Sequence, residues 1–298
     1  MAKATKASEP AKRRSIICAA RSGGQGKTTI AQLVHAVCQR HNIPHMLYSA
    51  DFLGRNDRSK LGKLYPGQVT ELGTGASFDD VKSSADMNQS VRYWDRLGDV
   101  LVEGGALIDL GANVIDRVFE WAEQRRAALV LDKRQAPGID MCVVCKSTMH
   151  SVEQAASLAN TFLEGRLFPV GRVFVIINEA DGKVLTEEAR NKLLPLKDHA
   201  EVDIIRLPYC DSEVWHLTEL HEKSLHEALE WDPDELVETY DIDIWEATSG
   251  LAELRAWYEV FEKKAFASGL IARNSGTPSD EPSDEPSDDP FDAPFADD

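Results

Sequence analysis

The sequence predicts an α/β protein with a doubly wound, mostly parallel sheet, helices on both faces and a helical C-terminal extension. Two observations support this fold class. Short apolar runs alternate with segments of helical period, which is the pattern of parallel strands joined by helical crossovers. A glycine-rich stretch also stands directly between the first apolar run and the first helical segment, where nucleotide-binding α/β folds place their phosphate loop.

Seven short apolar runs are predicted to be strands. They are residues 15–20, 45–50, 105–110, 127–132, 140–146, 173–178 and 202–208. Their near-continuous hydrophobicity is typical of strands that are covered on both faces.

The gaps between these runs are predicted to hold helices. The predicted helices are residues 27–39, 87–102, 114–126, 151–164 and 187–193, and a long closing helix over residues 250–272. Their apolar residues recur at the three- and four-residue spacing of a helix with one buried face.

The charge distribution divides the chain into four parts. A basic, flexible N-terminus covers residues 1–14, the strand-rich core covers 15–210, and a helical extension of the same domain covers 211–272. Residues 273–298 repeat proline, serine and acids and are expected to be disordered, because they contain too little apolar surface to offset the entropy lost on ordering. The formal net charge of the whole chain is −17.

The composition indicates a cytoplasmic protein. No apolar run has the length of a membrane span, and the basic N-terminus lacks the long apolar segment of a signal peptide. Five cysteines, an odd number, argue against a disulfide framework. Cys142 and Cys145 lie in a predicted strand, where a three-residue separation places their side chains on opposite faces, so they are interpreted as core residues.

The stretch "RSGGQGKTT" carries the main candidate site. Gly23, Gly24 and Gly26 allow a tight backbone turn whose amides, together with those of Gln25 and Thr29, can surround phosphate oxygens at a helix N-terminus. Lys27 is expected to reach the β and γ phosphates, and the Thr28 hydroxyl to ligate Mg²⁺.

The segment "SGGQGKTT" resembles the deviant phosphate loop of the ParA/MinD family of ATPases, whose usual form is Lys-Gly-Gly-x-Gly-Lys-Thr-Thr. The resemblance extends over about residues 15–210. It implies a doubly wound α/β fold that binds ATP and Mg²⁺ and in which two subunits enclose two ATP molecules as a homodimer.

Two further motifs fit the same family. After the second predicted strand, Asp51 corresponds to an acid that the resemblance assigns to orienting the attacking water and to the metal, and Gly54, Arg55 and Asn56 continue the motif. In "ALIDLGAN", Asp109 ends a predicted strand and is expected to hold Mg²⁺ through water, while the amide of Gly111 can follow the γ-phosphate.

The last two motifs concern the nucleotide base. Asn178 ends the run "VFVIIN", where family members present an asparagine to the edge of adenine. "LPYCDSEVW" resembles the next loop on the adenine side, so that Pro208 and its backbone are expected to pack near the base.

The chain also departs from the family. The signature lysine is replaced by Ser22, which removes a positive charge that stabilises phosphoryl transfer across the dimer. Arg21, one residue earlier, is a hypothetical substitute cation, and the first acid of the family's Asp-x-Asp motif is Ser49. Both losses predict slow, partner-stimulated hydrolysis in which Asp51, Lys27 and Arg21 form the catalytic set.

The sequence therefore indicates an ATP-dependent dimerising switch, most similar to divergent family members of plasmid stability and conjugal transfer or mobilisation (StbB, TraL and MobD type). Three alternatives stay open: a non-hydrolysing ATP-binding scaffold, a small-molecule ligase resembling dethiobiotin synthetase, and a DNA-binding partition motor.

The expected partners follow from the charges of the two ends. Phe291 and Phe295 punctuate the acidic tail and suggest a protein-docking segment. DNA binding through the basic N-terminus would be weak. Membrane binding is unlikely, because an acidic tail is repelled by anionic lipid.

Overall fold

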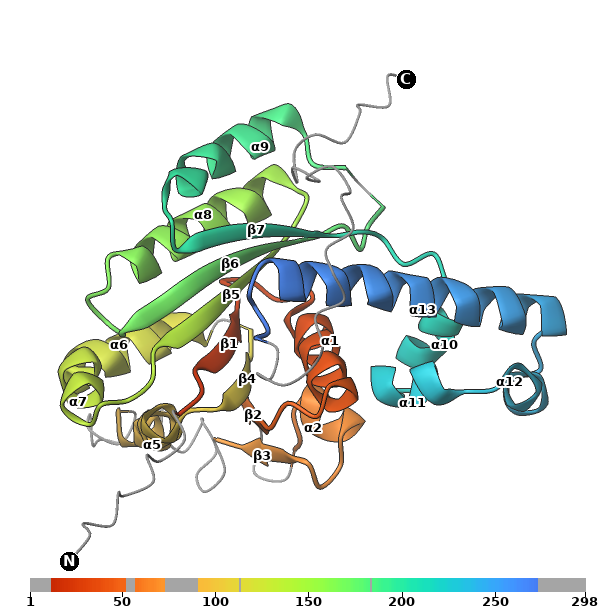
Figure 1. Ribbon diagram of the computed structural model, residues 1–298, viewed down its shortest axis with the longest axis horizontal. Helices are drawn as coiled ribbons and strands as arrows, with labels where there is room; N and C mark the ends of the chain where they lie inside the picture. Colours follow the sequence, from red (N-terminus) through yellow and green to blue (C-terminus); the bar gives the residue numbers. More distant parts are fainter. Residues whose placement is uncertain (1–11, 52–56, 73–90, 113, 183, 273–298) are drawn as a thin grey trace, which may run out of the picture.

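The computed structural model describes residues 12–51, 57–72, 91–112, 114–182 and 184–272. Its centre is a sheet of seven strands in the order β3-β2-β4-β1-β5-β6-β7 (Figure 1). Every neighbouring pair is parallel. The predicted doubly wound parallel sheet is therefore confirmed.

Six of the predicted strands are present with shifts of one to three residues at their ends. The strands are β1 (Ser15–Ala19), β2 (Met46–Ala50), β3 (Val69–Glu71), β4 (Ala106–Leu110), β5 (Ile139–Lys146), β6 (Val170–Asn178) and β7 (Val202–Leu207). Strand β3 was not predicted, because it has only three residues, all half-buried at the edge of the sheet. Such a short edge strand leaves no hydrophobic run in the sequence.

The predicted strand over residues 127–132 is wrong. This segment is the helix α7 (Ala127–Lys133), which begins after Arg126 in a left-handed conformation. Ala127 and Leu131 are buried on one face, whereas Leu129 and Val130 are exposed. The four-residue spacing of the buried positions is helical. The two places beside the central strand β1 are taken by β4 and β5.

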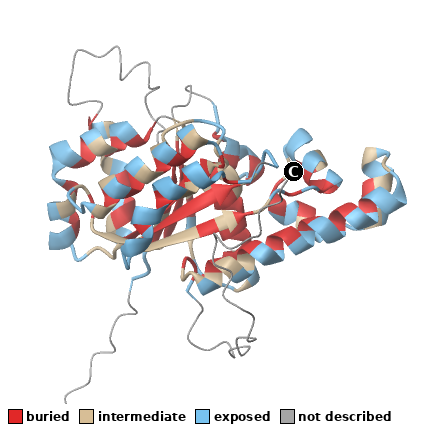
Figure 2. Ribbon diagram, turned by 90° about the horizontal axis from the view of Figure 1, so that it is seen from above, coloured by how far each residue is buried: buried red, intermediate tan, exposed pale blue. Residues whose placement is uncertain are grey.

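The helices cover both faces of the sheet (Figure 2). One face packs against α5 (Asp95–Glu103), α6 (Ile115–Arg125), α7, α8 (Met149–Leu163), α9 (Glu187–Leu193) and the 3₁₀ helix η1 (Leu194–Asp198). The other packs against α1 (Lys27–Arg40), α2 (Lys60–Leu64), α10 (Glu213–Leu220), α11 (Leu225–Glu230), α12 (Pro233–Tyr240) and α13 (Ile244–Ala267).

Alternation along the strands divides the core into these two layers. Cys142 and Val144 of β5 enter the α1 and α13 layer, and Val143 and Cys145 enter the α8 layer. The prediction that the two cysteines face opposite sides is confirmed. All five cysteines are buried free thiols.

The C-terminal region is helical, as predicted, but its long helix lies earlier in the chain than expected. Helix α13 begins after Asp243, whose side chain caps the amide of Trp245, and ends before Ser268. The predicted range of 250–272 therefore missed two N-terminal turns. Of the predicted helix 87–102, residues 87–90 lie outside the described residues, and α5 begins at Asp95.

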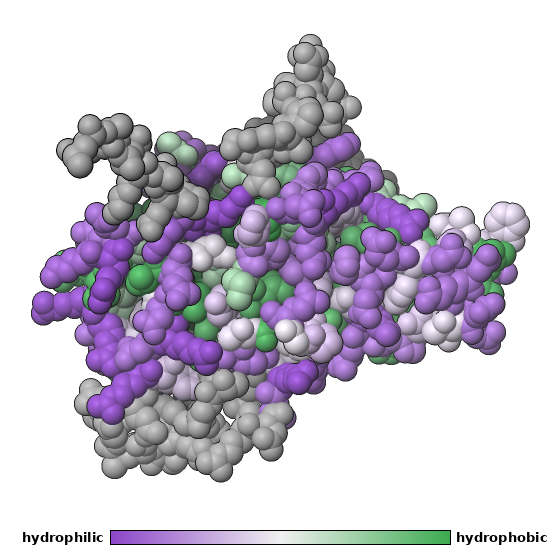
Figure 3. All heavy atoms as spheres, turned by 60° about the horizontal axis from the view of Figure 1, so that its bottom comes forward, coloured by the Kyte–Doolittle hydropathy of each residue, from purple (hydrophilic) through white to green (hydrophobic). Residues whose placement is uncertain are grey.

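One face of the molecule is mainly polar (Figure 3). On the face shown in Figure 3, hydrophilic residues predominate and the hydrophobic ones show between them in small groups. Among the described helices, none combines the length and the apolar character needed to cross a membrane.

Candidate functional site

The predicted site residues meet at the carboxyl end of the sheet. The glycine loop follows β1, Asp109 lies in the neighbouring strand β4 in register with Cys18, and Asp51 follows β2. Asn178 ends β6 beside Leu207 of β7. Chain crossovers diverge to the two sides of β1, and such a switch point is where open α/β sheets bind ligands.

Two glycines give the loop its shape. Gly24 and Gly26 have positive φ angles of 70° and 95°, which side-chain-bearing residues rarely adopt. A Cβ atom on Gly26 would also lie 2.1 Å from Nδ2 of Asn178, so this position has room only for hydrogen.

Helix α1 begins directly after Gly26 with an open N-terminus. It has no side-chain cap and no acidic residue in its first turn. Its first amides and the positive end of the helix dipole are therefore available to an anion, which is the electrostatic arrangement of a phosphate site.

The side chain of Gln25 fixes the loop to the rest of the domain. Its Oε1 accepts hydrogen bonds from the Lys146 amide at 3.0 Å and from the Ser151 hydroxyl. Its Nε2 donates to Ser22 Oγ at 3.0 Å. The loop is thus held by β5 and α8, more than 120 residues away in sequence.

Lys27 lies under the loop. Its Nζ donates to the Ser22 carbonyl at 3.3 Å, and the residue is only 7% exposed. Burial lowers the pKa of Lys27, and the nearby carboxylates of Asp109 and Asp51 act in the opposite direction. A cation held in a dry loop interacts strongly with a phosphate that displaces its weak carbonyl contact.

Thr28 and Asp109 form a hydrogen-bonded pair at the base of the loop. The Thr28 hydroxyl donates to Asp109 Oδ2 at 2.7 Å. Asp109 Oδ1 is buried without a hydrogen-bond partner. Burial raises the pKa of Asp109 to about 6, an effect that the Thr28 hydrogen bond and Lys27 partly offset. A buried carboxylate with one unsatisfied oxygen beside a hydroxyl fits an oxygen-ligated Mg²⁺.

Asp51 lies against Gly111. A Cβ atom on Gly111 would fall 1.9 Å from Asp51 Oδ1, so the carboxylate uses the space that glycine leaves. The Gly111 amide donates to the Ala50 carbonyl at 2.8 Å, which joins the ends of β2 and β4. The structure thus brings Asp51, Asp109 and Gly111 together as the sequence predicted. The residues Gly54, Arg55 and Asn56 of the same predicted motif lie outside the described residues.

Ser22, which replaces the signature lysine, and Arg21, the hypothetical substitute cation, both interact with side chains of neighbouring helices. Ser22 Oγ donates to Gln154 Oε1 of α8 at 3.1 Å, in addition to its bond with Gln25. The Arg21 guanidinium lies 3.8 Å from the carboxylate of Asp116 at the start of α6. In this structure Arg21 therefore extends toward α6, and whether it serves as the substitute cation stays a prediction.

The predicted base side consists of the loops after β6 and β7. Asn178 Nδ2 donates to the Gln25 carbonyl at 3.0 Å, so one of its two N–H donors is already used by the glycine loop. Thr29, Asn178 and Pro208 line a cavity of about 90 Å³. The prediction placed all three residues at the nucleotide, and the structure collects them around one hollow beside the loop.

The far wall of this cavity comes from the helical extension, which the sequence did not implicate. Trp257 of α13 donates its indole N–H to the Pro208 carbonyl at 2.8 Å, and its ring lies 5.4 Å from that of Trp215 in α10. Arg206 and Glu179 pair at 2.6 Å beneath the two loops, with both side chains largely buried. No local motif marks these residues, because each acts through a contact that is distant in sequence.

Fold and site together define an α/β protein with a doubly wound parallel sheet, in which a glycine loop joins the central strand β1 to helix α1. Within the described residues, no group of three or more His, Cys, Asp or Glu side chains is placed to hold a metal ion.

No family model and no curated protein matches the chain. It is similar to the solved structure of a ParA family ATPase from Chlorobium tepidum TLS, with a TM-score of 0.47, 15% identity and coverage of 83% of this chain and 98% of that one.

Two other solved structures show a comparable likeness. A putative plasmid partition protein from Borrelia burgdorferi B31 bound to AMPPNP has a TM-score of 0.43 at 12% identity, covering 85% of this chain and 100% of that one. The cell division ATPase MinD of Pyrococcus furiosus has a TM-score of 0.42 at 15% identity, covering 85% and 99%. The function proposed below rests on the side chains of the site.

Proposed function

We propose that this protein is an ATP-binding switch of the ParA/MinD type that hydrolyses ATP slowly. One observation carries the proposal: Lys27 lies in a glycine loop at the switch point of a parallel sheet, where its charge interacts with both Asp51 and Asp109. A buried lysine held between two acids next to an open helix N-terminus is suited to bind a polyphosphate together with a divalent cation.

The residues have separable tasks in this proposal. The loop amides and Lys27 bind the phosphates, and Thr28 and Asp109 hold Mg²⁺, with Asp51 nearby. When bound, the metal would neutralise charge on the phosphate oxygens. Asp51 would orient the attacking water, because its carboxylate lies beside the Gly111 backbone at the end of the site where the γ-phosphate is expected.

Adenine is the proposed base. Asn178 Nδ2 donates one of its two N–H groups to Gln25, so the amide oxygen and one N–H are left for a ligand, and the oxygen is a hydrogen-bond acceptor. A hydrogen-bond acceptor matches the 6-amino group of adenine and opposes the 6-oxo group of guanine. The protein should therefore prefer ATP to GTP.

The biological output belongs to the same proposal. ATP binding would join two copies of the chain into a homodimer. The homodimer would bind a partner protein and contact DNA only weakly. It would act in plasmid partition, plasmid stability, or conjugal transfer and mobilisation. The support is the loop "SGGQGKTT" and the acids that follow β2 and end β4.

A second candidate is a scaffold that binds ATP without hydrolysing it. Ser22 favours it: this uncharged side chain stands where the family has its signature lysine, and its hydroxyl bonds with Gln154 and Gln25. Arg21, the cation that directly precedes Ser22 in the sequence, pairs with Asp116 in this structure. The stabilisation of transition-state charge would then be absent.

Phosphate release and sedimentation with and without ATP and Mg²⁺ separate the two candidates. We expect wild type to dimerise with ATP and to release phosphate slowly, Lys27→Ala to lose both, and Arg21→Ala to lose turnover alone. Lys133→Ala, on the exposed end of α7, is the matched control and should behave as wild type. Dimerisation with no phosphate release above background would favour the scaffold, and absence of nucleotide binding would overturn both.

A further inference from the structure

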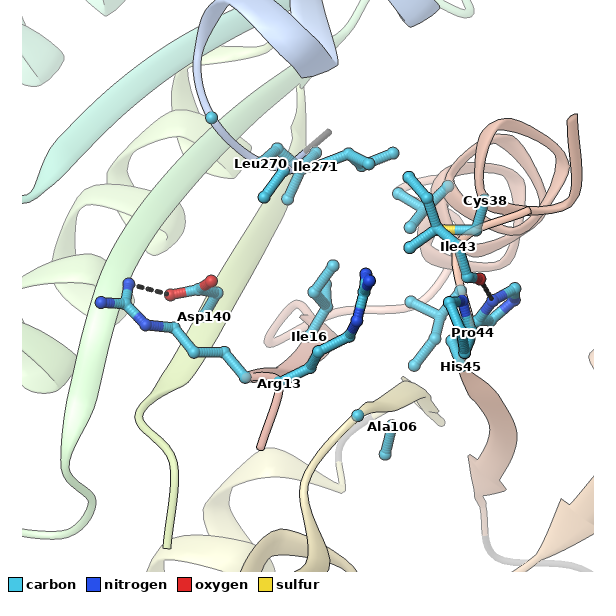
Figure 4. A pocket seen from close by; sticks show the side chains of 16 residues that line it. Arg13, Ile16, Cys38, Ile43, Pro44, His45, Ala106, Asp140, Leu270 and Ile271 are labelled. Carbon is cyan, nitrogen blue, oxygen red and sulfur yellow. Dashed lines mark hydrogen bonds and ion pairs between the residues drawn. The ribbon is translucent and has the colours of Figure 1, made fainter. Parts of the chain in front are cut away.

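Two cavities lie away from the glycine loop, and they differ in how their charges are arranged. The first, of about 430 Å³, lies at the amino ends of β1, β4 and β5, beside the last turns of α1 and the residues that follow α13. Figure 4 shows mainly aliphatic side chains around it. Its acid, Asp140, is already bonded to the Arg14 guanidinium at 3.2 Å.

The second cavity, of about 390 Å³, lies between α1 and the helical extension. Its walls come from α1, α2, α10 and the turn that follows α10. None of the residues proposed to bind the nucleotide lines it, although Trp215 and Glu219 border both this cavity and the hollow beside the glycine loop. The volume is within the range of pockets for small molecules. The cavity is therefore a separate space that adjoins the candidate nucleotide site.

Charged side chains of opposite sign line this cavity from two elements. Lys60 and Lys63, three residues apart on α2, form a lysine rim. Glu219 and Glu222, with the same spacing at the end of α10 and in the turn after it, form a glutamate rim. A separation of three residues places each pair on one side of its element. Within the described part of the chain, none of these four side chains forms a hydrogen bond or an ion pair.

The other charges around the cavity have partners of their own. Lys223, the third lysine of the lining, pairs with Glu227 at 3.8 Å. Lys60 also acts electrostatically on the carboxylate of Asp109, in the direction that lowers the pKa of that acid. The lysine rim therefore lies on the side of the candidate magnesium site, and the glutamate rim lies on the side of the helical extension.

A buried amide supplies a hydrogen-bond donor to the same cavity. Gln32 of α1 is 4% exposed and is part of the lining. Its Oε1 accepts the Leu225 amide at 2.9 Å, which fixes the orientation of the side chain. Among the described residues, its Nε2 has no hydrogen-bond partner. Buried amide groups are normally satisfied, so this nitrogen calls for an acceptor in the cavity.

An indole ring and an aliphatic side chain supply apolar wall. Trp215 of α10 and Leu64 of α2 both line the cavity, and both are buried. Trp215 packs against Trp257 with ring centroids 5.4 Å apart, which holds the indole in place. The cavity thus combines a cationic rim, an anionic rim, an amide donor and an apolar surface.

We propose that this cavity binds a free α-amino acid with an apolar side chain. The carboxylate of the ligand would lie against the lysine rim and the amide nitrogen of Gln32. Its ammonium group would lie against the glutamate rim, and its side chain against Trp215 and Leu64. A zwitterion is favoured over a simple ion, because an anion would be repelled by the glutamate rim and a cation by the lysine rim.

Ligand analogues test the two charges on the full-length protein. Calorimetric titration with L-phenylalanine should show binding with an affinity in the millimolar range or better. Phenylpropionate, which lacks the amino group, and phenylethylamine, which lacks the carboxylate, should bind severalfold more weakly. If neither L-phenylalanine nor L-leucine binds, the proposal is wrong. Equal affinities for phenylalanine and its two analogues would also overturn it, because the rims would then not recognise a zwitterion.

Neutral variants of the lysine rim locate the carboxylate of the ligand. Lys60→Gln with Lys63→Gln should weaken phenylalanine binding severalfold, whereas binding of phenylethylamine should not fall. Lys133→Gln with Arg134→Gln is the matched control, because it removes the same charge from the exposed end of α7. Equal affinities of the two double variants for phenylalanine would contradict the proposed contact.

Neutral variants of the glutamate rim locate the ammonium group. Glu219→Gln with Glu222→Gln should weaken phenylalanine binding severalfold, whereas binding of phenylpropionate should not fall. Glu187→Gln with Glu188→Gln, on the exposed side of α9, removes the same charge and should bind phenylalanine as wild type does. An equal loss for phenylalanine and phenylpropionate would argue against an ammonium contact at this rim.

The amide donor is tested with Gln32→Glu. This change keeps an acceptor for the Leu225 amide but replaces the free donor by a second acceptor, which repels a carboxylate. Phenylalanine binding should be lost, and thermal unfolding checks that the variant is folded. Unchanged binding in the folded variant would show that Gln32 does not contact the ligand.

A fluorine label reports the position of the ligand directly. In protein that contains fluorotryptophan, the resonance that disappears in Trp215→Phe should shift when phenylalanine is added. The resonance that disappears in Trp245→Phe should stay in place, because Trp245 is 80% exposed at the start of α13. If phenylalanine binds without a shift at Trp215, the ligand lies elsewhere and the proposal fails.

ATP distinguishes this cavity from the candidate nucleotide site. Phenylalanine should still bind when ATP and Mg²⁺ are present at saturation, and Lys27→Ala should bind phenylalanine as wild type does, because Lys27 does not line the cavity. These results are expected whether or not the protein hydrolyses ATP. Displacement of phenylalanine by ATP would assign the cavity to the nucleotide site and overturn the proposal.

Discussion

The proposed phosphate side and the proposed base side of the candidate site differ in how their residues are assembled. On the phosphate side, the loop residues and Lys27 to Thr29 are contiguous, and their shape follows from glycines with positive φ angles. On the base side, Asn178, Pro208 and Trp257 come from β6, the end of β7 and α13. The first is a local backbone structure, and the second exists only when distant elements pack. Variants on the two sides should therefore fail in different ways.

The largest loss of ATP binding is expected for Gly26→Ala. Its Cβ would meet the amide of buried Asn178 and its φ angle would be strained, so stability should fall by at least about 1–2 kcal/mol and ATP binding should be lost. Gly24→Ala is the control for stability, because its Cβ meets no atom within 4 Å and it bears only the strain of its φ angle of 70°. Urea denaturation measures the stability of each variant, and equilibrium dialysis measures its ATP binding. Equal stability losses in the two variants would mean that contact with Asn178 does not matter.

The next largest effect is expected for Asp109→Asn, and it has opposite signs for stability and binding. Burial raises the pKa of Asp109 to about 6 from 3.8, so the folded state retains its proton to higher pH than the unfolded chain does. The protonated form of Asp109 therefore stabilises the folded state. This contribution is complete below about pH 4 and is lost as the pH rises through about 6. Since one pKa unit corresponds to 1.36 kcal/mol, asparagine should exceed wild type by about 3 kcal/mol at pH 8.

Two measurements check this prediction. The stability difference between Asp109→Asn and wild type should shrink as urea denaturation is repeated toward pH 4. Mg²⁺-dependent ATP binding should fall in the variant at every pH, and in wild type as pH drops through about 6, because the protonated acid cannot hold the metal. If Asp109→Asn is less stable than wild type at pH 8, burial of the ionised Asp109 carboxylate does not destabilise the folded state.

A smaller effect is expected on the base side for Trp257→Phe. The change removes the hydrogen bond to the Pro208 carbonyl and should cost about 1 kcal/mol, with a severalfold loss of ATP affinity and unchanged turnover at saturation. Trp245→Phe is the control, because that residue is 80% exposed at the start of α13. Calorimetric titration with ATP and with GTP measures the affinities. A loss of turnover without a loss of ATP affinity would indicate that Trp257 acts on the phosphate side of the site rather than on the base side.

The smallest effect is expected for Ser22→Ala. Its hydroxyl bonds Gln154 and Gln25 rather than carrying charge, so stability should fall by about 1 kcal/mol while the rate of phosphate release stays the same. Thermal unfolding and a phosphate assay decide this. A changed rate at constant stability would give Ser22 a part in the chemistry.

The sequence by itself determined the fold class and the phosphate side. Hydrophobic periodicity is a local signal, and it located six strands because buried parallel strands need continuous apolar residues. The glycines, Lys27 and Thr28 were found because a tight anion-binding turn imposes its requirements on adjacent residues. Asp51 and Asp109 were found through their resemblance to family motifs, and the parallel pairing of β2 with β4 brings the two strand ends together.

The tertiary structure alone decided the rest. Residues 127–132 have the composition of a strand but form the helix α7, whose buried residues Ala127 and Leu131 pack into the core on one face of the sheet. Gln25 is clamped by Ser151, and Pro208 by Trp257, across separations of 126 and 49 residues. The cavity at the amino ends of the strands likewise forms where α1, β1, β4, β5 and the end of the helical region meet. Contacts of this kind depend on how elements pack, and packing is a property of the whole fold that no local pattern of residues encodes.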